Sequence, residues 1–306
     1  MKVLIIGSGG FLGGWVKKLI RTQNNYEFIE INGKKDLDIT NINDLDIFFQ
    51  KNKPEAVINC AAFVGGIAYG YKYSATMLSE NSKMALNLYD ICNKYNIKTL
   101  VNPISNCAYP GHLTTYREED FFNGPPHESV YNYATSKRLS VNLGSSYFKQ
   151  YGFTSSSVVL SNMYGPEDHF DIERSHALGA LIKKICDAKV KDINSVEIWG
   201  TGNPIREWLY VEDGANALLK SLELNNGHYL FNIGIQKGIS ILDLANTIKT
   251  IVNWNGEFQF NTERPDGVLE KKVDGKQGAE LLNWKPDFEL RNGIEKTVEW
   301  YLNKNG

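Results

Sequence analysis

The sequence predicts an α/β fold in which a doubly wound parallel sheet is accompanied by a smaller α+β lobe. In the first half of the chain, short apolar runs alternate with longer segments whose apolar residues recur at helical spacing. Such alternation is typical of βαβ units, whose right-handed crossovers place successive strands in one parallel sheet. After about Asn162 the rhythm changes to helices mixed with short strands. We therefore expect two lobes, residues 1–162 and 163–306, with the chain returning to the first near residues 206–233.

The expected elements follow from the length and pattern of each segment. Short apolar runs suit strands that are buried on both faces of a parallel sheet, and the first half contains these: Lys2–Ile6, Glu27–Ile31, Ala56–Cys60, Lys98–Ile104 and Thr154–Leu160. The second half predicts short strands near Val196 and Trp208 and these helices: Ser175–Ala188, Ile239–Val252 and Leu290–Leu302. Because no proline-rich linker separates the lobes, we expect them to pack tightly around a ligand cleft.

Composition and charge exclude several classes of protein. A formal net charge of −2 over 306 residues gives no broad basic field for nucleic acid or an anionic membrane. The longest apolar runs fall short of the roughly 20 residues that a membrane helix needs. The chain begins with a strand instead of a cleavable leader, and no CxxC pair occurs among its cysteines, Cys60, Cys92, Cys107 and Cys186. We expect a cytoplasmic protein without a metal site that binds neither nucleic acid nor membrane.

A glycine cluster follows the first expected strand and opens a helix. Its glycines, Gly7, Gly10 and Gly13, have GxxGxxG spacing, with Phe11 and Leu12 between the last two. Glycine permits the tight turn, the close approach of the backbone to a pyrophosphate and the packing of helix on strand. A simple glycine-rich turn is the alternative, but the order of strand, glycines and helix indicates a Rossmann-type dinucleotide site.

The end of the second strand indicates which dinucleotide binds. An acidic side chain there bonds the ribose hydroxyls of NAD, whereas a basic one favours the 2′-phosphate of NADP. The chain has Asn32-Gly-Lys34-Lys35 at this position, which favours NADPH, with Asn32 and Lys34 as cofactor contacts. NAD stays possible, because Glu30 could serve as the ribose acceptor if the strand is shifted by two residues.

A second motif predicts reduction of a carbonyl group. Tyr133 and Lys137 have YxxxK spacing, which places phenol and ammonium on one helix face, one turn apart. The ammonium is expected to lower the pKa of Tyr133 from about 10 so that the phenol can protonate a carbonyl oxygen as hydride arrives. Ser105 ends the fourth strand and could bond the same oxygen. The alternative is a packed tyrosine beside a snorkelling lysine.

With these features the chain resembles the extended short-chain dehydrogenase/reductase superfamily, and within it most closely the GDP-L-fucose synthase family, which acts on GDP-4-keto-6-deoxymannose. The resemblance covers nearly the whole chain. It rests on the dinucleotide and YxxxK motifs and on further segments: Ala61–Ile67, Ser105–Pro110, Asn162–Pro166, Ser175–Leu178 and Trp199–Glu207. It implies a homodimer formed by two helices per subunit, which we place at Ser79–Tyr95 and Ser129–Tyr151.

The resemblance also implies roles for individual residues. Cys107 corresponds to the family's base beside the ketone and His176 to the acid that returns protons from the other face. A buried apolar cysteine and a histidine bonded to backbone are the alternative reading. In the cofactor site it adds Ala61, together with Tyr133 and Lys137, of which Lys137 is expected to orient the nicotinamide ribose. For the nucleotide sugar it implies contacts in both lobes: Val64, Gly65, Asn162, Lys183, Trp199, Arg206, Arg264 and Asp266.

Three departures from the family pattern bear on the substrate. Ser8-Gly9 replaces a basic residue of the first turn, Asn106 stands where a second serine is typical, and Leu160-Ser161 replaces Pro-Thr. Ser8-Gly9 weakens the preference for NADP over NAD. The departures at Asn106 and Leu160-Ser161 indicate a keto sugar that differs from the family's substrate.

The resulting hypothesis is an NADPH-dependent 4-reductase of a GDP-4-keto-6-deoxy hexose or heptose, with C3/C5 epimerisation. Its alternatives are a 4-reductase without epimerisation, an NAD-cycling nucleotide-sugar 4-epimerase or dehydratase, and a dinucleotide-sensing protein without catalysis.

Overall fold

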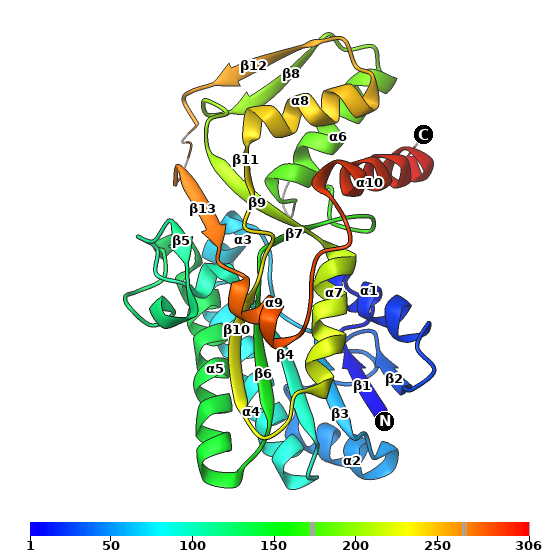
Figure 1. Cartoon of the computed structure of the whole chain (residues 1–306), viewed down its shortest axis with the longest axis vertical. Helices are drawn as coiled ribbons and strands as arrows, with labels where there is room; N and C mark the ends of the chain where they lie inside the picture. The colour runs from blue at the N-terminus through cyan, green and yellow to red at the C-terminus, as the bar shows by residue number, and fades with distance from the viewer. Residues whose placement is uncertain (172–174, 265, 267, 306) are drawn as a thin grey trace.

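A computed structural model describes residues 1–171, 175–264, 266 and 268–305. Figure 1 shows a large sheet flanked by helices, with a smaller lobe at one end of it. Within the described residues, no helix combines the length and the apolar character that crossing a bilayer requires.

The large sheet confirms the predicted doubly wound architecture. Its strands pair only in parallel, in the order β10-β6-β4-β3-β1-β2 among the described residues. The strands are β1 (Lys2–Ile6), β2 (Glu27–Ile31), β3 (Ala56–Asn59), β4 (Thr99–Ser105), β6 (Ser155–Leu160) and β10 (His228–Ile233). Because all the strands run in one direction, their carboxyl ends meet at one edge, where ligands bind in this class of sheet.

Alternation along the strands divides the apolar side chains between two cores. Val3 and Ile5 of β1 pack in one core with α1 (Phe11–Ile20) and α7 (Val211–Lys220). Leu4 and Ile6 pack in the other with α2 (Ile42–Asn52) and α4 (Ser74–Lys94). Side chains of α5 (Tyr131–Tyr151) pack against this second core. Both sheet faces are therefore covered, which is why the strands read as continuous apolar runs.

The smaller lobe is built on a second sheet with its own core. This sheet has the order β11-β9-β13-β5, with β7 paired to β9, and β12 pairs separately with β8. Its strands are β5 (Thr115–Tyr116), β7 (Asn162–Tyr164), β8 (Ser195–Trp199), β9 (Ile205–Tyr210), β11 (Gly238–Ser240), β12 (Glu257–Asn261) and β13 (Glu270–Val273). Its helices are α6 (Ala177–Val190), α8 (Ile241–Val252) and α10 (Leu290–Asn305), while α9 (Lys276–Leu281) lies against β10.

The expected elements are present, with shifts at their ends. The helix predicted over Ser175–Ala188 is α6, which begins two residues later because His176 has extended backbone angles. The short helix α3 (Ile67–Lys72) was not predicted. A loop after β4 forms the short helical turns η1 (Asn106–Ala108), η2 (Glu118–Asp120) and η3 (Glu128–Val130) before α5 begins.

Candidate active site

The glycine turn lies between β1 and α1. Gly7 has φ of 80°, a left-handed conformation that favours glycine, and a Cβ atom there would lie 2.7 Å from the backbone nitrogen of Ala61. A Cβ atom on Gly13 would collide with the carbonyl oxygen of Gly7. No side chain of the described residues caps α1, which has Gly10 at its N-cap and no acid in its first turn. The open N–H groups of this helix end fit a pyrophosphate.

The end of β2 lies beside this turn. Asn32 accepts a hydrogen bond from the Ser8 hydroxyl at 3.1 Å. Glu30, the alternative ribose acceptor, instead forms ion pairs with Lys17 of α1 and with Arg21, which follows the end of α1, at 3.3 and 3.6 Å. These two cations direct the Glu30 carboxylate toward α1, so the geometry does not favour Glu30 as a ribose ligand.

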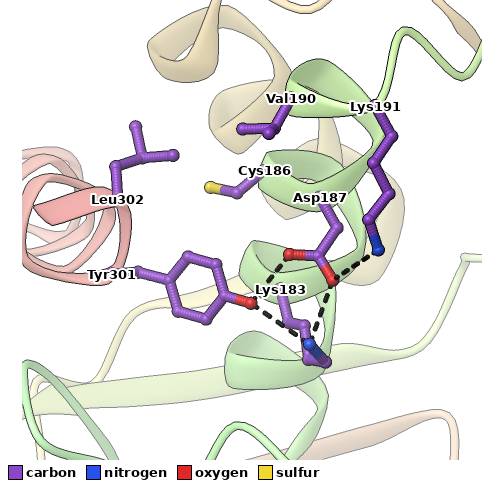
Figure 2. A pocket seen from close by; sticks show the side chains of 7 residues that line it. All are labelled: Lys183, Cys186, Asp187, Val190, Lys191, Tyr301 and Leu302. Carbon is purple, nitrogen blue, oxygen red and sulfur yellow. Dashed lines mark hydrogen bonds and ion pairs between the residues drawn. The ribbon is translucent and has the colours of Figure 1, made fainter. Parts of the chain in front are cut away.

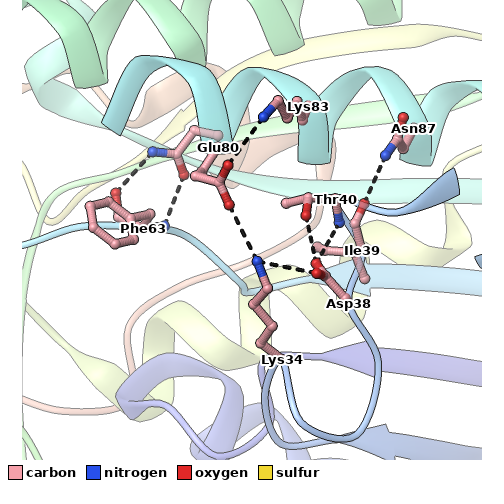
Figure 3. A network of polar contacts seen from close by, with 9 residues as sticks. Lys34, Asp38, Ile39, Thr40, Phe63, Glu80, Lys83 and Asn87 are labelled. Atoms are coloured by element: carbon pink, nitrogen blue, oxygen red, sulfur yellow. Dashed lines mark hydrogen bonds and ion pairs between the residues drawn. The ribbon is translucent and has the colours of Figure 1, made fainter. Parts of the chain in front are cut away.

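Lys34 is held in a polar network, which Figure 3 shows. Its ammonium lies 3.1 Å from Asp38 and 3.4 Å from Glu80 of α4. Hydrogen bonds and charges from these carboxylates raise the pKa of Lys34. Lys35 is exposed, and among the described residues it has no ion pair. Lys34 would have to leave two carboxylates to reach a phosphate, whereas Lys35 would not.

Ser105 and Cys107 share one turn at the end of β4. The backbone N–H of Cys107 donates to the Ser105 hydroxyl oxygen at 3.4 Å, which caps η1. Burial raises the pKa of the Cys107 thiol, while a hydrogen bond from Ser105 and the positive charges of Lys137 and Lys271 oppose this rise. The thiol therefore lies within the field of two lysines, one from each lobe.

Tyr133 and Lys137 lie on the first turns of α5 and face this turn. The Lys137 ammonium is 5.6 Å from the centre of the Tyr133 ring and donates to the carbonyl oxygen of Pro103 at 3.1 Å. Burial lowers the pKa of Lys137 to about 8. The sequence predicted a lowered pKa for Tyr133, but burial raises it well above its ordinary value. The neighbouring Cys107 adds to the rise of the Tyr133 pKa, and the Lys137 ammonium bonds a backbone carbonyl instead of the phenol.

His176 ends the segment before α6, in the smaller lobe. Burial and the positive charge of His169 lower the pKa of His176, although much of its surface is exposed. The charges acting on Cys107 come from Lys137 and Lys271 instead. The charges that shift the pKa of Cys107 and that of His176 thus come from different side chains.

Contacts at the ends of β3 and β6 complete the large-sheet side of the site. Ala61 donates its backbone N–H to Asn59 at 3.2 Å. Val64 is exposed, and Gly65 packs against the Tyr69 ring closely enough that a Cβ atom there would clash. The Asn162 amide donates to the carbonyl oxygen of Glu207 at 3.1 Å.

Asn106, the departure from the family serine, contributes to this side of the site. Its amide donates to the Asn162 side-chain oxygen at 3.3 Å. Asn106 therefore ties the Ser105–Cys107 turn to the start of β7.

Two cations lie over the ring of Trp199 in the smaller lobe. Its exposed ring has Lys184 at 5.4 Å and Arg264 at 5.1 Å from its centre. Its indole nitrogen donates to Glu197 at 2.7 Å. An exposed aromatic ring can stack on a nucleobase, and the cations beside it can bind the phosphates of a nucleotide.

Lys271 and its neighbour Arg206 are two further cations on the smaller-lobe side of the Ser105–Cys107 turn. Burial lowers the pKa of Arg206, and the nearby Asp266 carboxylate opposes this. Asp266 accepts hydrogen bonds from the backbone and the hydroxyl of Thr201 at 2.6 and 2.7 Å. Burial and the charge of Arg206 lower the pKa of Lys271, which Cys107 opposes. Of the segment Arg264–Gly267, Pro265 and Gly267 lie outside the described residues.

Lys183, predicted as a phosphate cation, points away from this cluster. It lies beside a cavity of about 250 Å³ between α6 and α10, where it bonds Asp187 at 3.0 Å and the Tyr301 hydroxyl at 3.2 Å (Figure 2). The adjacent Lys184 faces Trp199 instead. Successive helical residues point about 100° apart, so Lys184 and not Lys183 lies on the side of α6 that faces Trp199. No local motif in the sequence marks Lys271.

Comparisons with known proteins show the family and similar folds. The family model described as NAD dependent epimerase/dehydratase family matches residues 3–234. The GDP-L-fucose synthase of Sinorhizobium fredii is 32% identical over 302 residues, which cover 98% of this chain and 95% of that protein. A GDP-L-fucose synthetase from Naegleria fowleri bound to NADP superposes with a TM-score of 0.89 at 26% identity, covering 99% of this chain and 94% of the other. The GDP-mannoheptose C4 reductase of Campylobacter jejuni, with NADP bound, gives 0.87 at 27% identity and 98% coverage of both chains.

Proposed function

The chain belongs to the NAD dependent epimerase/dehydratase family, and we propose that it reduces the C4 ketone of a GDP-linked 4-keto-6-deoxy hexose or heptose with NADPH, with epimerisation at C3 and C5. One observation carries the proposal: the Ser105–Cys107 turn lies against Tyr133 and Lys137 at the carboxyl edge of the large sheet. The names of the relatives supply the substrate class, since they act on GDP-hexoses and GDP-heptoses.

NADPH is the cofactor of this proposal, and two related structures contain NADP. The turn at Gly7, Gly10 and Gly13 would hold its pyrophosphate at the uncapped end of α1. Asn32 and Lys35 lie where the adenosine ribose is expected. When bound, the cofactor supplies the hydride for the ketone.

Ser105 and Tyr133 act on the ketone oxygen. The raised pKa of Tyr133 keeps its phenol protonated at neutral pH, so it can donate a proton to the developing alkoxide. The Ser105 hydroxyl donates a second hydrogen bond to the same oxygen. The Lys137 ammonium, charged below about pH 8, stabilises the phenolate that remains.

Epimerisation requires a base and an acid beside the ketone. Cys107 would remove the protons at C3 and C5, which the ketone acidifies, and the charges of Lys137 and Lys271 favour its thiolate. His176, with its lowered pKa, releases a proton readily once charged. The enolate formed between these steps is stabilised by Ser105 and Tyr133.

The smaller lobe would bind the nucleotide. We assign the diphosphate to Arg206, Lys184 and Lys271, and the nucleoside to Trp199, Arg264 and Asp266. Val64, Gly65 and Asn162 would contact the sugar. Guanidinium groups bind phosphate with two parallel hydrogen bonds, which suits Arg206 to the diphosphate.

We infer the division into lobes, the cellular location and the oligomeric state from the sequence. We assign residues 1–162, with the segment near 206–233, to dinucleotide binding and residues 163–306 to the nucleotide sugar. We also propose that the protein works in the cytoplasm and forms a homodimer through α4 and α5.

A reductase without epimerisation is the second candidate. The different charges that act on Cys107 and His176 favour it, and a related structure is a C4 reductase. Deuterium from solvent at C3 and C5 of recovered substrate indicates epimerisation, and its absence leaves reduction alone.

The deciding experiment offers purified protein the 4-keto sugars of GDP, dTDP, UDP and CDP, with NADPH or NADH, followed by NMR of the product. We expect NADPH oxidation with GDP-4-keto-6-deoxymannose. Tyr133→Phe should lower kcat by about 10²- to 10⁴-fold while NADPH still binds. Turnover of dTDP or UDP sugars alone would contradict the assigned nucleotide.

A further inference from the structure

Arg138 follows Lys137 on α5 and binds three backbone carbonyl groups. Its Nε donates to Ala108 at 2.7 Å, and its terminal nitrogens donate to Gly124 at 2.8 Å and to Phe121 at 2.9 Å. Ala108 and Phe121 are fully buried. Buried carbonyl groups need a hydrogen-bond partner, and one guanidinium supplies it to all of these.

The three carbonyl groups belong to the two arms of one loop. Ala108 ends η1, directly after Cys107, whereas Phe121 and Gly124 lie on the returning arm. The loop is closed at its neck, where Gly111 donates to Pro125 at 3.0 Å. Arg138 therefore fastens the outgoing arm to the returning one and both arms to α5.

The side chains around the guanidinium suit arginine. Its central carbon lies 5.8 Å from the centre of the Phe121 ring and 5.7 Å from that of Phe122. A planar fork can stack on aromatic rings and hold several oxygens at once, whereas a lysine ammonium is a compact point charge. The site is thus specific for the shape of arginine as well as its charge.

Two consecutive residues of α5 anchor the catalytic turn at both ends. Lys137 bonds the carbonyl oxygen of Pro103, two residues before Ser105, and Arg138 bonds that of Ala108, one residue after Cys107. The same helix carries Tyr133. A single rigid element therefore sets the position of the phenol and of the turn that holds the hydroxyl and the thiol.

We propose that Arg138 is a positioning residue that holds Cys107 at the sugar ring, in register with Tyr133. This inference rests on the proposed function. Displacement of a catalytic group by about 1 Å can cost on the order of 100-fold in rate. Loss of Arg138 should therefore slow proton abstraction at C3 and C5 while NADPH binding is retained, because we assign the pyrophosphate to the turn at Gly7, Gly10 and Gly13, whereas the Arg138 guanidinium bonds Ala108, Phe121 and Gly124.

The test compares Arg138→Met and Arg138→Lys with Lys149→Met, an exposed lysine near the end of the same helix. Each protein is incubated with GDP-4-keto-6-deoxymannose in D₂O without NADPH, and deuterium at C3 and C5 is followed by NMR. We expect exchange to fall about 10- to 100-fold in Arg138→Met and less in Arg138→Lys. The Kd of NADPH should stay within about twofold of wild type, and Lys149→Met should match wild type throughout.

Exchange by folded Arg138→Met within about twofold of wild type would overturn the inference. If that variant does not fold, Arg138→Lys is judged by the same criterion, since a lysine can reach only one carbonyl oxygen at a time. If wild type itself exchanges no deuterium, the epimerase part of the proposed function fails, and alkylation of Cys107 by iodoacetamide decides about Arg138. We then expect the alkylation rate to rise about fivefold or more in the variant, and an unchanged rate would refute the positioning role.

Discussion

Tyr133 and Lys137 lie one helical turn apart, and the protein around them shifts both pKa values toward the neutral side chain. The pKa of Tyr133 rises and that of Lys137 falls to about 8. Desolvation is the main cause of both shifts, because burial removes the water that stabilises the charged form of each side chain. The Tyr133 phenol is thus a neutral acid, and the Lys137 ammonium beside it loses its proton above about pH 8.

Reduction should therefore decline as pH rises through about 8. Below that value Lys137 is charged and can stabilise the Tyr133 phenolate, and above it the ammonium is lost. Tyr133 cannot cause this decline, because its raised pKa lies above the range. The measurement is the pH profile of kcat/KM for NADPH-dependent reduction. In Lys137→Arg, whose guanidinium stays charged, a lower activity without the alkaline decline is expected, and an unchanged decline would assign it to another group.

The two lysines after β2 should differ in their effect on NADPH. Lys34 is shared between Asp38 and Glu80, whereas Lys35 is exposed. We expect Lys35→Ala to raise the Kd of NADPH on the order of tenfold, about 1.4 kcal/mol, and to leave that of NADH unchanged. Lys34→Ala is the matched variant, with a smaller effect. Fluorescence titration checks both, and an equal loss for NADH would exclude a contact to the 2′-phosphate.

Sequence reasoning finds site residues whose geometry is local. Tyr133 and Lys137 lie on a helix that their spacing predicts, and Ser105 lies at the end of a strand that its apolar run predicts. The choice between Lys183 and Lys184 depends on which side of α6 faces Trp199. This side is fixed by the packing of α6 against α10. Lys271 comes from β13, whose partners β5 and β9 are distant in sequence.

At the level of elements, a half-buried histidine joins β10 to β6 within the large sheet. His228 shares a hydrogen bond with the Ser155 hydroxyl of β6 at 2.9 Å, and its other ring nitrogen is buried without a partner among the described residues. Its ring fills the space beside Gly144 of α5, where a Cβ atom would collide. Burial lowers the pKa of His228 to about 4, since a charged ring would need a second acceptor.

Stability should consequently fall as the solution is acidified from about pH 6.5 to pH 4. The unfolded chain binds a proton at the ordinary histidine pKa, while folded His228 stays neutral until about pH 4, so acid favours unfolding in this window. We expect a loss of about 1 to 3 kcal/mol, reduced from the full shift because the ring is partly exposed. Urea unfolding of His228→Asn should lack this part of the pH dependence. Exposed His112→Asn is the control, and equal behaviour of both variants would assign the effect elsewhere.

Strands such as β1 and β3 were predictable because burial on both faces leaves a short, continuous apolar run. Strand β2 matches its predicted range and β3 ends one residue earlier than expected. Strand β10 carries polar residues, among them His228 and Asn232, and was not predicted as a strand. The Asn232 amide is buried because it donates to the carbonyl groups of Tyr116 and Asp274. Such a strand is defined by its long-range partners.

On the scale of the whole molecule, one carboxylate ties the two sheets to each other. Glu207 of β9 is buried and accepts hydrogen bonds from the backbone of Ile235, Gln236 and Val273 at 2.6, 3.3 and 2.7 Å. These residues follow β10 and end β13. The lobes are therefore interleaved, and no single cut in the sequence separates them.

Helices α4 and α5 pack side by side on one face of the large sheet (Figure 1). Both helices expose large apolar side chains. Leu86 of α4 and Tyr151 of α5 are 43% and 54% exposed. Apolar surface of this kind on neighbouring helices is typical of an isologous interface. We expect light scattering to give twice the mass of one chain for wild type, and the double variant Leu86→Glu/Tyr151→Glu to be a monomer, because it would bury four carboxylates across a two-fold axis. Val190→Glu, at an equally exposed site on α6, should stay dimeric. A wild-type mass of one chain at every concentration would show that these helices have no second copy as partner.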